Sequence, residues 1–434
     1  MAEFSRIQVG KLVASGEVEL KTGPFGTQLK ASEYTKHGTP VINVRNIGLG
    51  SIKADKLEFI SLATRDRLSS HLLRRGDIVF GRKGAVERHV FIRQEQDGWF
   101  QGSDCLRLRF ASTRVEPLFA SYYFLTNDHQ RWMMNQCSHG ATMSSLNQAI
   151  LERIELPLPP LPIQQRIAGI LSAYDELIEN SQRRIRILEM MARALYREWF
   201  VHFRFPGHEN HPRVPSPLGE IPQGWEVTTV VDAFAISGGG TPSRKEDAFW
   251  QSGTIQWYSP SDLTGAGTMF MDDSSDHITE RGLAKSSARM FPKRSVMLTS
   301  RATIGAIAIN TRPACTNQGF ITCLPNERVP LYFLFHWLTE NVPTFQRMAS
   351  GATFKEISRG VFKTIEFLQP PQAIVRRFEE IASPMAEEVL ALQRQIQNLR
   401  RTRDLLLPRL LSGQIEVGDL LAHSPFANGE KAGT

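Results

Sequence analysis

The stretch LPLPPLPIQQRIAGIL, Leu156–Leu171, passes from a proline-rich apolar run directly into a helical pattern. A second stretch, FLQPPQAIVRRFEEIA at Phe367–Ala382, repeats this pattern, with Pro370 corresponding to Pro159 at an offset of 211 residues. Proline has no amide hydrogen and keeps the residue before it extended, so each run ends a strand pattern and fixes where the next helix begins. The chain therefore contains the same junction twice.

The repeat extends upstream of the junction. Gly140–Thr142 recurs as Gly351–Thr353 at the same offset. The segments further back correspond with a drifting register: GTPVINVRNI from Gly38 and GTIQWYSPSDL from Gly253, RRGDIVFGR from Arg74 and PKRSVMLTSR from Pro292, PLFASYYF from Pro117 and PLYFLFHW from Pro330. Similarity at a period of about half the chain indicates a duplicated unit. A single Pro-Pro run would also suit a polyproline ligand, but its recurrence favours a structural joint.

Each half is expected to form an α+β unit. Short segments rich in β-branched and aromatic residues, such as VINV, DIVFG and VFI in the first half and TIQWY, SVMLTS and AIAI in the second, predict strands between glycine and proline turns. One or two helices are expected beside them. The segment 208–224 is rich in proline, glycine and polar residues and is interpreted as a linker.

A long helix with a heptad pattern follows each junction. The expected seam consists of Ile167, Leu171, Tyr174, Ile178, Ile185, Leu188 and Leu195 in the first helix, and of Phe378, Met385, Val389, Leu392, Ile396, Leu399 and Leu406 in the second. Steps of four and three are typical of coiled coils. A helix of roughly 48 Å is too long for either unit alone, so we expect the two helices to pair antiparallel, with the repeats related by a pseudo-two-fold axis.

Two residues interrupt the second heptad pattern. Arg403 lies at a seam position near the helix end, where its charge could reach water. Pro384 lies within the helical pattern and predicts a kink or a late helix start. In the first helix, Met190 and Met191 are expected to fill the seam.

Composition excludes several classes of protein. The chain has 434 residues, of which 41% are hydrophobic and 22% charged, and this suits two or three globular domains. A net charge of +7 makes nucleic acid a plausible partner. Four widely spaced cysteines form no CxxC pair, which argues against zinc and against a secreted disulfide framework, and favours a reducing cytoplasm. Neither a signal peptide nor a membrane span is indicated.

The common catalytic motifs are missing from the sequence. It has no GxxxxGK[ST] phosphate loop, no GxGxxG after a strand and no HExxH. It also lacks the [DN]PP[YF] tetrapeptide of amino-methyltransferases, because its two Pro-Pro pairs sit in LPPL and QPPQ. We therefore expect no catalytic residue, no metal site and no bound cofactor in this chain.

With these features the sequence resembles the specificity (S) subunit of type I restriction–modification systems over almost its whole length. The most specific stretches are GATMSSLNQAILERIELPLPPLPIQQRIAGIL, REWFVHFRFPG after the first long helix, SPLGEIPQGWEV before the second unit, and LLLPRLLSGQI near the end. Their order and spacing carry the resemblance. One departure is that the first unit begins with IQVGKLV and lacks the IPxGW pattern of the second.

The resemblance implies two α/β target-recognition domains joined by two long helices. Their expected extents are 1–161 and 222–372 for the recognition domains, 162–205 and 373–410 for the helices, 206–221 for the linker and 411–434 for a C-terminal tail. It further implies that each domain recognises one half of a bipartite, gapped DNA site. The helices would set the spacing and dock two methyltransferase (M) subunits that methylate adenine N6. S-adenosylmethionine, ATP and Mg would be bound by the M subunits and by restriction (R) subunits.

Direct contacts to DNA require basic and small polar residues on loops. The candidates are Lys21, Lys30, Arg45, Arg82, Lys83, Thr142 and Ser144 in the first unit, and Arg244, Lys245, Ser259, Ser261, Arg301, Thr303 and Lys355 in the second. Each could equally be a surface charge or a turn former. The aromatic residues of 199–205 could form a docking patch or pack at the helix end. Two other functions remain open, a stand-alone regulator that binds bipartite DNA and the specificity half of a fused restriction–methylation enzyme.

Overall fold

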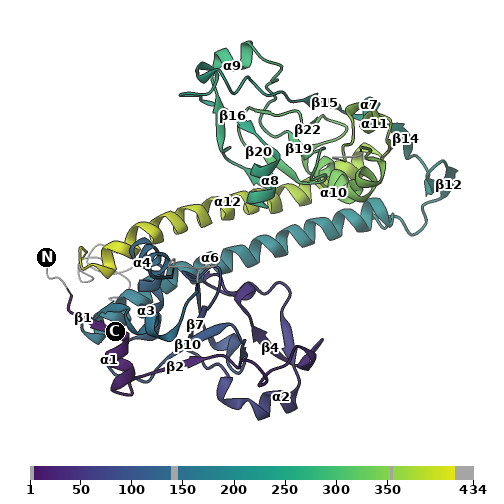
Figure 1. Cartoon of the computed structure of the whole chain (residues 1–434). Helices are drawn as coiled ribbons and strands as arrows, with labels where there is room; N and C mark the ends of the chain where they lie inside the picture. The colour runs from purple at the N-terminus through teal and green to yellow at the C-terminus, as the bar shows by residue number, and fades with distance from the viewer. Residues whose placement is uncertain (1–3, 138–144, 352–354, 416–434) are drawn as a thin grey trace, which may run out of the picture. The chain divides into compact units, whose positions relative to one another are not determined.

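The computed structural model describes residues 4–137, 145–351 and 355–415. The chain divides into two compact units. Unit 1 comprises Met1–Ile178 and Asn398–Thr434, and unit 2 comprises Glu179–Gln397. Each unit combines a strand-rich domain with one part of each long helix (Figure 1). No helix among the described residues is both long and apolar enough to span a membrane.

The main sheet of each unit has five strands in the same order. In unit 1 the order is β2 (Val18–Thr22), β10 (Cys105–Phe110), β7 (Ile78–Gly81), β8 (His89–Phe91) and β5 (Leu49–Gly50). In unit 2 it is β15 (Ala235–Gly238), β22 (Phe320–Leu324), β19 (Val296–Thr299), β20 (Ile307–Asn310) and β17 (Phe270–Met271). In both sheets the last pair is parallel and the other pairs are antiparallel. The repeat in the sequence is thus a repeat of topology.

The smaller sheets are duplicated as well. Unit 1 has β3 (Tyr34–Thr35), β6 (Glu58–Ile60), β4 (Thr39–Ile42) and β9 (Phe100–Gln101), and unit 2 has β18 (Asp276–Ile278), β16 (Ile255–Tyr258) and β21 (Ala314–Thr316). The first and last strands of each repeat pair antiparallel, β1 (Arg6–Gln8) with β11 (Glu155–Pro157) and β14 (Glu226–Thr229) with β23 (Glu366–Gln369). The strand segments predicted from the sequence are confirmed, and IQVGKLV occupies the same place as EVTTVVDA.

Each unit has more helices than the one or two expected. Unit 1 contains α1 (Val9–Ala14), α2 (Leu62–Arg67), α3 (Pro117–Phe124), α4 (Asn127–Cys137) and α5 (Gln148–Glu152). Unit 2 contains α7 (Val230–Ala233), α8 (Pro260–Ala266), α9 (Glu280–Ala284), α10 (Leu331–Met348) and α11 (Arg359–Lys363). Most of them have eight residues or fewer. So short a helix shows too little of the 3.6-residue period to be predicted from it.

The two long helices begin directly at the proline junctions. Helix α6 (Leu161–Tyr196) continues as a π-helical turn, Arg197–Val201, and α12 spans Gln372–Leu411. The first turns are equivalent, because the Ile163 amide donates to Pro160 O (2.9 Å) and the Ile374 amide donates to Pro371 O (3.0 Å). The expected late start at Pro384 is wrong, since α12 already begins before it. A proline within a helix removes one backbone hydrogen bond, and the helix continues through it.

The long helices pair antiparallel within each unit. In unit 1, Ile167 and Leu171 of α6 join Leu410 of α12 in one apolar cluster. In unit 2, Tyr196 joins Phe378 in the main core. One ion pair in each unit joins α6 to α12: Asp175 with Arg403 (2.6 Å) in unit 1, and Arg184 with Glu388 (2.6 Å) in unit 2. Every residue named for the seam is buried or half-buried.

Two expectations about the long helices and one about the linker require correction or refinement. Met190 and Met191 do not fill the seam, because they are 63% and 50% exposed. Arg403 is half-buried, with 29% of its side chain exposed, and forms ion pairs with Asp175 and Asp404. The linker segment contains a two-stranded hairpin, β12 (Arg213–Ser216) with β13 (Gly219–Pro222).

The aromatic residues after α6 pack internally and do not form a surface patch. Trp199, Phe200 and Phe205 are each less than 8% exposed. The Phe200 ring lies 4.8 Å from that of Phe333 and 5.2 Å from that of Phe378, measured between ring centroids. The packing alternative is therefore confirmed, and these rings attach the end of α6 to the core of unit 2.

The ion pair between Asp175 and Arg403 gives a test of this helix pairing. Arg403→Leu should lower the free energy of unfolding of unit 1 by about 1–3 kcal/mol, because a half-buried carboxylate loses its charged partner. Hydrogen exchange of the amides in 161–178 would measure the loss.

The double variant Asp175→Ala/Arg403→Leu serves as the control. It leaves no unpaired charge and should recover part of the stability that the single variant loses. Additive losses in the double variant would show that the two side chains do not interact.

Candidate nucleic-acid interface

Five loop segments lie together in each unit. In unit 1 they follow β2, β4, β7 and β9 and precede α5, and we call 23–26, 43–46, 82–84, 102–104 and 145–148 loop cluster 1. In unit 2 the equivalent segments, 239–242, 259–262, 300–303, 317–319 and 355–359, form loop cluster 2. Four of the segments in each cluster follow strands of two sheets, so the sheets hold them in place.

Backbone hydrogen bonds connect the segments of loop cluster 1. The Gly102 amide donates to Ile42 O (3.0 Å), the Arg82 amide to Asp104 O (2.9 Å) and the Leu146 amide to Arg82 O (2.8 Å). These bonds join four chain segments, and none of them depends on a side chain.

Loop cluster 2 has the same bonds at the equivalent positions. The Asn317 amide donates to Tyr258 O (3.0 Å), the Ser300 amide to Gly319 O (2.8 Å) and the Ile357 amide to Ser300 O (3.0 Å). Since every bond is between backbone groups, the framework does not restrict which side chains project from it.

Two equivalent glycines allow this close approach of the backbones. A Cβ atom on Gly23 would lie 2.0 Å from Gly102 O, and one on Gly239 would lie 2.1 Å from Asn317 O. Neither distance is compatible with a side chain. The glycine turns recognised in the sequence are thus required by packing against the loop that follows β9 or β21.

A capped turn follows the inner strand of each small sheet. The Asn43 amide donates to Asn46 Oδ1 (3.1 Å), and the Ser259 amide donates to Asp262 Oδ2 (2.7 Å). The residue inside each turn, Arg45 or Ser261, is exposed. The two turns therefore share a backbone conformation but expose different side chains.

The same contrast holds at other equivalent positions. Cluster 1 presents basic, amide and hydroxyl groups where cluster 2 presents different ones; the pairs are Asn43 and Ser259, Arg45 and Ser261, Lys83 and Arg301, Ser103 and Gln318, Gln148 and Arg359. Arginine, asparagine, glutamine and serine are the residue types that recognise base edges, while lysine and arginine also bind phosphates. Each cluster therefore exposes residue types that suit contacts with DNA, and the two sets of residues differ.

Most of the predicted DNA-binding residues lie in the clusters. They are Arg45, Arg82 and Lys83 in cluster 1, and Ser259, Ser261, Arg301, Thr303 and Lys355 in cluster 2. Their ion pairs are superficial: Arg45 with Glu58 (2.7 Å), Lys83 with Asp104 (3.4 Å) and Arg301 with Glu356 (3.8 Å). Pairs of this kind contribute about 1 kcal/mol or less, so a phosphate can compete for the cation.

Other predicted residues belong to different surroundings. Lys21 lies on β2, where burial and then the neighbouring Arg107 lower its pKa. Lys30 precedes a 3-10 turn, Ala31–Glu33, and its amide donates to Glu33 (2.8 Å). Thr142 and Ser144 lie outside the described residues.

Arg244 follows the first segment of loop cluster 2 and makes its own contacts within the domain. Its guanidinium stacks on Trp250 at 3.5 Å from the ring centroid and pairs with Asp276 at 2.5 Å. The adjacent Lys245 is exposed. Both side chains are exposed, and Arg244 additionally has a stacking and an ion-pair partner within the domain.

Sequence reasoning missed several polar residues of the clusters. Gln148 Nε2 donates to Thr22 Oγ1 (3.0 Å), and Thr241 Oγ1 donates to Gln318 Oε1 (2.7 Å). The Arg359 guanidinium covers the place where a Cβ of Gly238 would be. The offset of 211 relates Gln148 to Arg359, so the repeat itself contained a signal for this pair.

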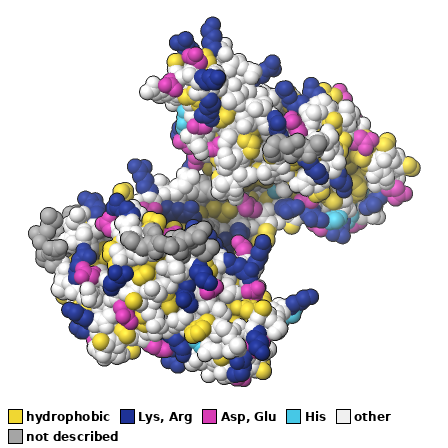
Figure 2. Space-filling model, in the orientation of Figure 1, with side chains coloured by type: hydrophobic (Ala, Val, Ile, Leu, Met, Phe, Trp, Pro, Cys, Tyr) yellow, Lys and Arg dark blue, Asp and Glu magenta, His cyan; other side chains and the backbone are white. Residues whose placement is uncertain are grey.

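The charge distribution is mixed on the face shown in Figure 2, where lysine and arginine are interspersed with acidic residues. The net charge of +7 is therefore not gathered into one basic surface on that face. Among the described residues no group of three or more His, Cys, Asp or Glu could hold a metal ion.

Comparisons with known proteins agree with this geometry. A family model described as "Type I restriction modification DNA specificity domain" matches residues 23–190 and 222–398. The chain is 27% identical to the type I restriction enzyme MjaIX specificity subunit of Methanocaldococcus jannaschii, covering 69% of each chain. It is 23% identical to the putative MjaX specificity subunit of the same organism, covering 95% of this chain and 97% of that one.

A solved structure has a similar fold. The S subunit of a type I restriction–modification system from M. genitalium matches with a TM-score of 0.62 at 16% identity, covering 94% of this chain and 96% of that one. At this identity the likeness concerns the fold alone.

The glycine contacts predict a local effect on loop cluster 2. Gly239→Ala should displace the loop after β21, because the new Cβ would meet Asn317 O at 2.1 Å. We expect lower stability and increased exchange of the Ser300 and Asn317 amides, measured by hydrogen exchange.

Gly265→Ala is the matched control. It lies within α8, and a Cβ there meets nothing within 4 Å. Because alanine favours a helix over glycine by up to about 1 kcal/mol, this variant should be neutral or slightly more stable. Equal behaviour of the two variants would contradict the close-approach argument.

Proposed function

The chain belongs to the family of type I restriction–modification DNA specificity proteins, and we propose that each of its loop clusters recognises one half of a bipartite, gapped DNA site. It is a specificity subunit and not the catalytic chain of its system. The proposal rests on one observation above all. The two clusters share three equivalent backbone hydrogen bonds and differ in the side chains that they expose.

The side chains that differ between the clusters bear on which bases each cluster prefers. Two copies of a domain that kept both backbone and side chains would prefer the same bases. Here Asn43, Arg45 and Ser103 in cluster 1 stand where cluster 2 has Ser259, Ser261 and Gln318. Different donors and acceptors on one framework suit two different half-sites. The intervening base pairs would not be contacted directly, and the paired helices would set their number.

The long helices also support a partner subunit. Three large apolar residues on α6, Ile187, Met190 and Met191, are 45%, 63% and 50% exposed. Their spacing of three and four residues places them on one helix face. Exposed apolar patches of this kind are typical of protein interfaces. We propose that this face docks a methyltransferase subunit, and that the duplicated chain docks two of them.

The partners would supply all the chemistry. In this proposal the methyltransferase subunits bind S-adenosylmethionine and methylate adenine N6, and restriction subunits add ATP- and Mg-dependent cleavage. The complex would work in the prokaryotic cytoplasm, in keeping with four free, buried cysteines in this chain. A stand-alone DNA-binding regulator is the alternative. The exposed apolar face on α6 favours a chain that has a protein partner.

The central experiment is co-expression with a methyltransferase subunit encoded beside this chain, followed by mapping of methylated adenines across the host genome. We expect one bipartite motif with a fixed gap. A chain that purifies without a methyltransferase partner, or a methylated motif without a gap, would refute the proposal.

Equivalent substitutions should affect different halves of the site. Gln148→Ala should relax base preference in one half and Arg359→Ala in the other, each by about 1–3 kcal/mol. Competition binding with a library randomised in each half separately would measure this. Arg376→Ala on α12, an exposed arginine outside both clusters, should change neither preference. An effect of Gln148→Ala on both halves would contradict one cluster per half-site.

The docking face gives an independent prediction. Met190→Asp/Met191→Asp should weaken binding of the methyltransferase subunit that docks on α6 at least about tenfold, because two carboxylates would have to be desolvated in the interface. DNA binding by the free chain should not change. Leu62→Asp on α2, where the leucine is 64% exposed, is the control. Loss of the partner in that control would mean that the docking site is not on α6.

A further inference from the structure

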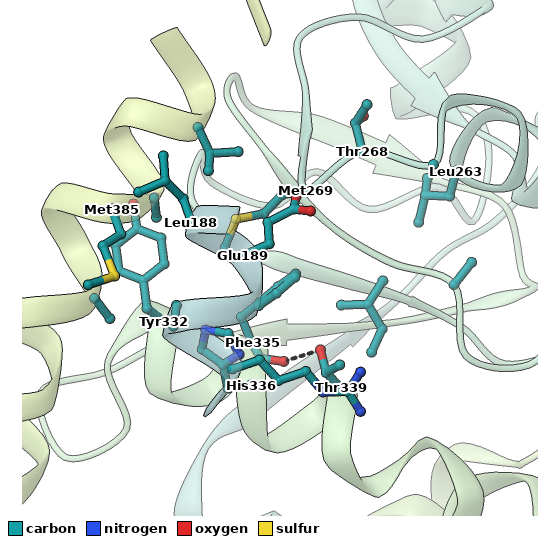
Figure 3. A pocket seen from close by; sticks show the side chains of 18 of the residues that line it. Leu188, Glu189, Leu263, Thr268, Met269, Tyr332, Phe335, His336, Thr339 and Met385 are labelled. Carbon is teal, nitrogen blue, oxygen red and sulfur yellow. Dashed lines mark hydrogen bonds between the residues drawn. The ribbon is translucent and has the colours of Figure 1, made fainter. Parts of the chain in front are cut away.

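Unit 2 contains a pocket of about 370 Å³ beside the long helices. Residues of α6, α12 and α10, together with the loop before β17 and the strand β20, line it (Figure 3). The walls are mainly apolar, with Leu188, Met269, Phe335, Met385 and Val389 among them. A volume near 300 Å³ or above with a few polar groups is typical of small-molecule sites.

Two polar side chains in the pocket lack partners. His336 is 4% exposed, and neither of its ring nitrogens has a hydrogen-bond partner among the described residues. Glu189 is half-buried and forms no ion pair with any described residue. Burial lowers the pKa of His336 to about 4, so the ring is neutral near pH 7 and offers one acceptor nitrogen. Figure 3 shows both side chains among the apolar residues of the pocket.

The other polar groups of the pocket are already engaged. Arg193 pairs with Glu340 at 2.6 Å, and the Tyr332 hydroxyl donates to Glu387 at 2.7 Å. Thr339 Oγ1 donates to Phe335 O at 2.8 Å. The unused capacity is therefore that of a carboxylate and of a neutral imidazole, which has one acceptor and one donor nitrogen. The carboxylate and the imidazole acceptor together favour a positively charged donor.

The repeat shows what fills the equivalent place in unit 1. Tyr122 in PLFASYYF corresponds to Phe335 in PLYFLFHW, and the offset of 211 relates Asp175 to Ala386 and Ala192 to Arg403. Ala192, Ala386 and Phe335 all line the pocket of unit 2.

Unit 1 fills this place with a cation. The Tyr122 hydroxyl donates to Asp175 Oδ2 (2.6 Å), and the Arg403 guanidinium donates to Asp175 Oδ1 (2.6 Å). Unit 2 replaces the charged pair by two alanines and the phenol by a phenyl ring. The pocket of unit 2 thus corresponds to the place that the tyrosine hydroxyl, the carboxylate and the guanidinium fill in unit 1.

We propose that the pocket of unit 2 binds a small organic cation with an apolar body, whose guanidinium or ammonium group faces Glu189 and His336. The apolar body would lie against Phe335, Met385 and Val389. The head would take a place like that of the Arg403 guanidinium in unit 1. This inference does not depend on DNA recognition, so it can fail or hold separately from the proposed function.

Benzamidine is a suitable probe, because it joins an amidinium to a flat apolar ring. We expect the full chain without DNA to bind benzamidine in calorimetry and to show shifts of labelled methyl signals from Met269 and Met385. Glu189→Gln should weaken binding about tenfold or more, since it removes the charged acceptor. Benzamide, the neutral analogue, should bind at least about tenfold more weakly than benzamidine.

Two filling variants complete the test. Ala192→Arg/Ala386→Asp transfers the charged pair of unit 1, and Ala386→Leu fills the pocket with apolar bulk if the first variant does not fold. Either should abolish binding. Glu380→Gln, an exposed glutamate of α12 that does not line the pocket, should bind like the wild type. The proposal is overturned if the wild type does not bind, if benzamide binds equally well, or if a folded filling variant still binds.

Discussion

The pairing of α6 with α12 is the interaction on which both units depend. Neither core is closed by residues that are near one another in the sequence. The apolar cluster beside α3 needs Ile167 from α6 and Leu410 from α12, and the main core of unit 2 needs Tyr196 and Phe378 from the same two helices. A change of register between the helices would therefore open the cluster beside α3 in unit 1 and the main core of unit 2, and this explains why the heptad pattern persists through the duplication. Among the described residues, the sheet core of unit 1 contains no residue of either long helix.

The second constraint is the close approach of backbones at the loop clusters. Gly23 and Gly239 leave no room for a side chain against the carbonyl groups of Gly102 and Asn317. Where the backbone alone determines the loop positions, the side chains that project from them are free to differ. A duplicated domain can then acquire a second base preference without a new fold. Backbone atoms thus stabilise the positions of the loops, and side-chain atoms determine the chemistry of the surface.

The sequence predicted the features that depend on local pattern. Proline chemistry gave the junctions at Pro160 and Pro371, and the heptad pattern gave the long helices. It did not predict which side of α6 is covered, so Met190 and Met191 were assigned wrongly. Two adjacent methionines cannot both face one seam, and only packing decides what covers the rest of the helix. The short helices likewise depend on tertiary contacts.

The candidate site was predicted in part for a related reason. Lysine and arginine near glycine turns, such as Lys83 and Arg301, could be predicted because these residue types are typical of contacts with DNA. Gln148 and Arg359 were missed, although the repeat relates them, because their place beside the strand ends of Thr22 and Gly238 is a property of the folded chain.

The joints between domain and helices show how far duplicated parts can diverge. Both follow the same Pro-Pro junction and the same first helical turn. In unit 1 the joint is closed by a tyrosine, a carboxylate and a guanidinium. In unit 2 the equivalent residues are apolar and small, and a cavity remains. Losing the aspartate and the arginine together leaves no unpaired charge, whereas losing one alone leaves a buried ion without its partner. Unit 2, which has neither ion, therefore carries no such penalty, and His336 and Glu189 are polar groups in the lining of its cavity.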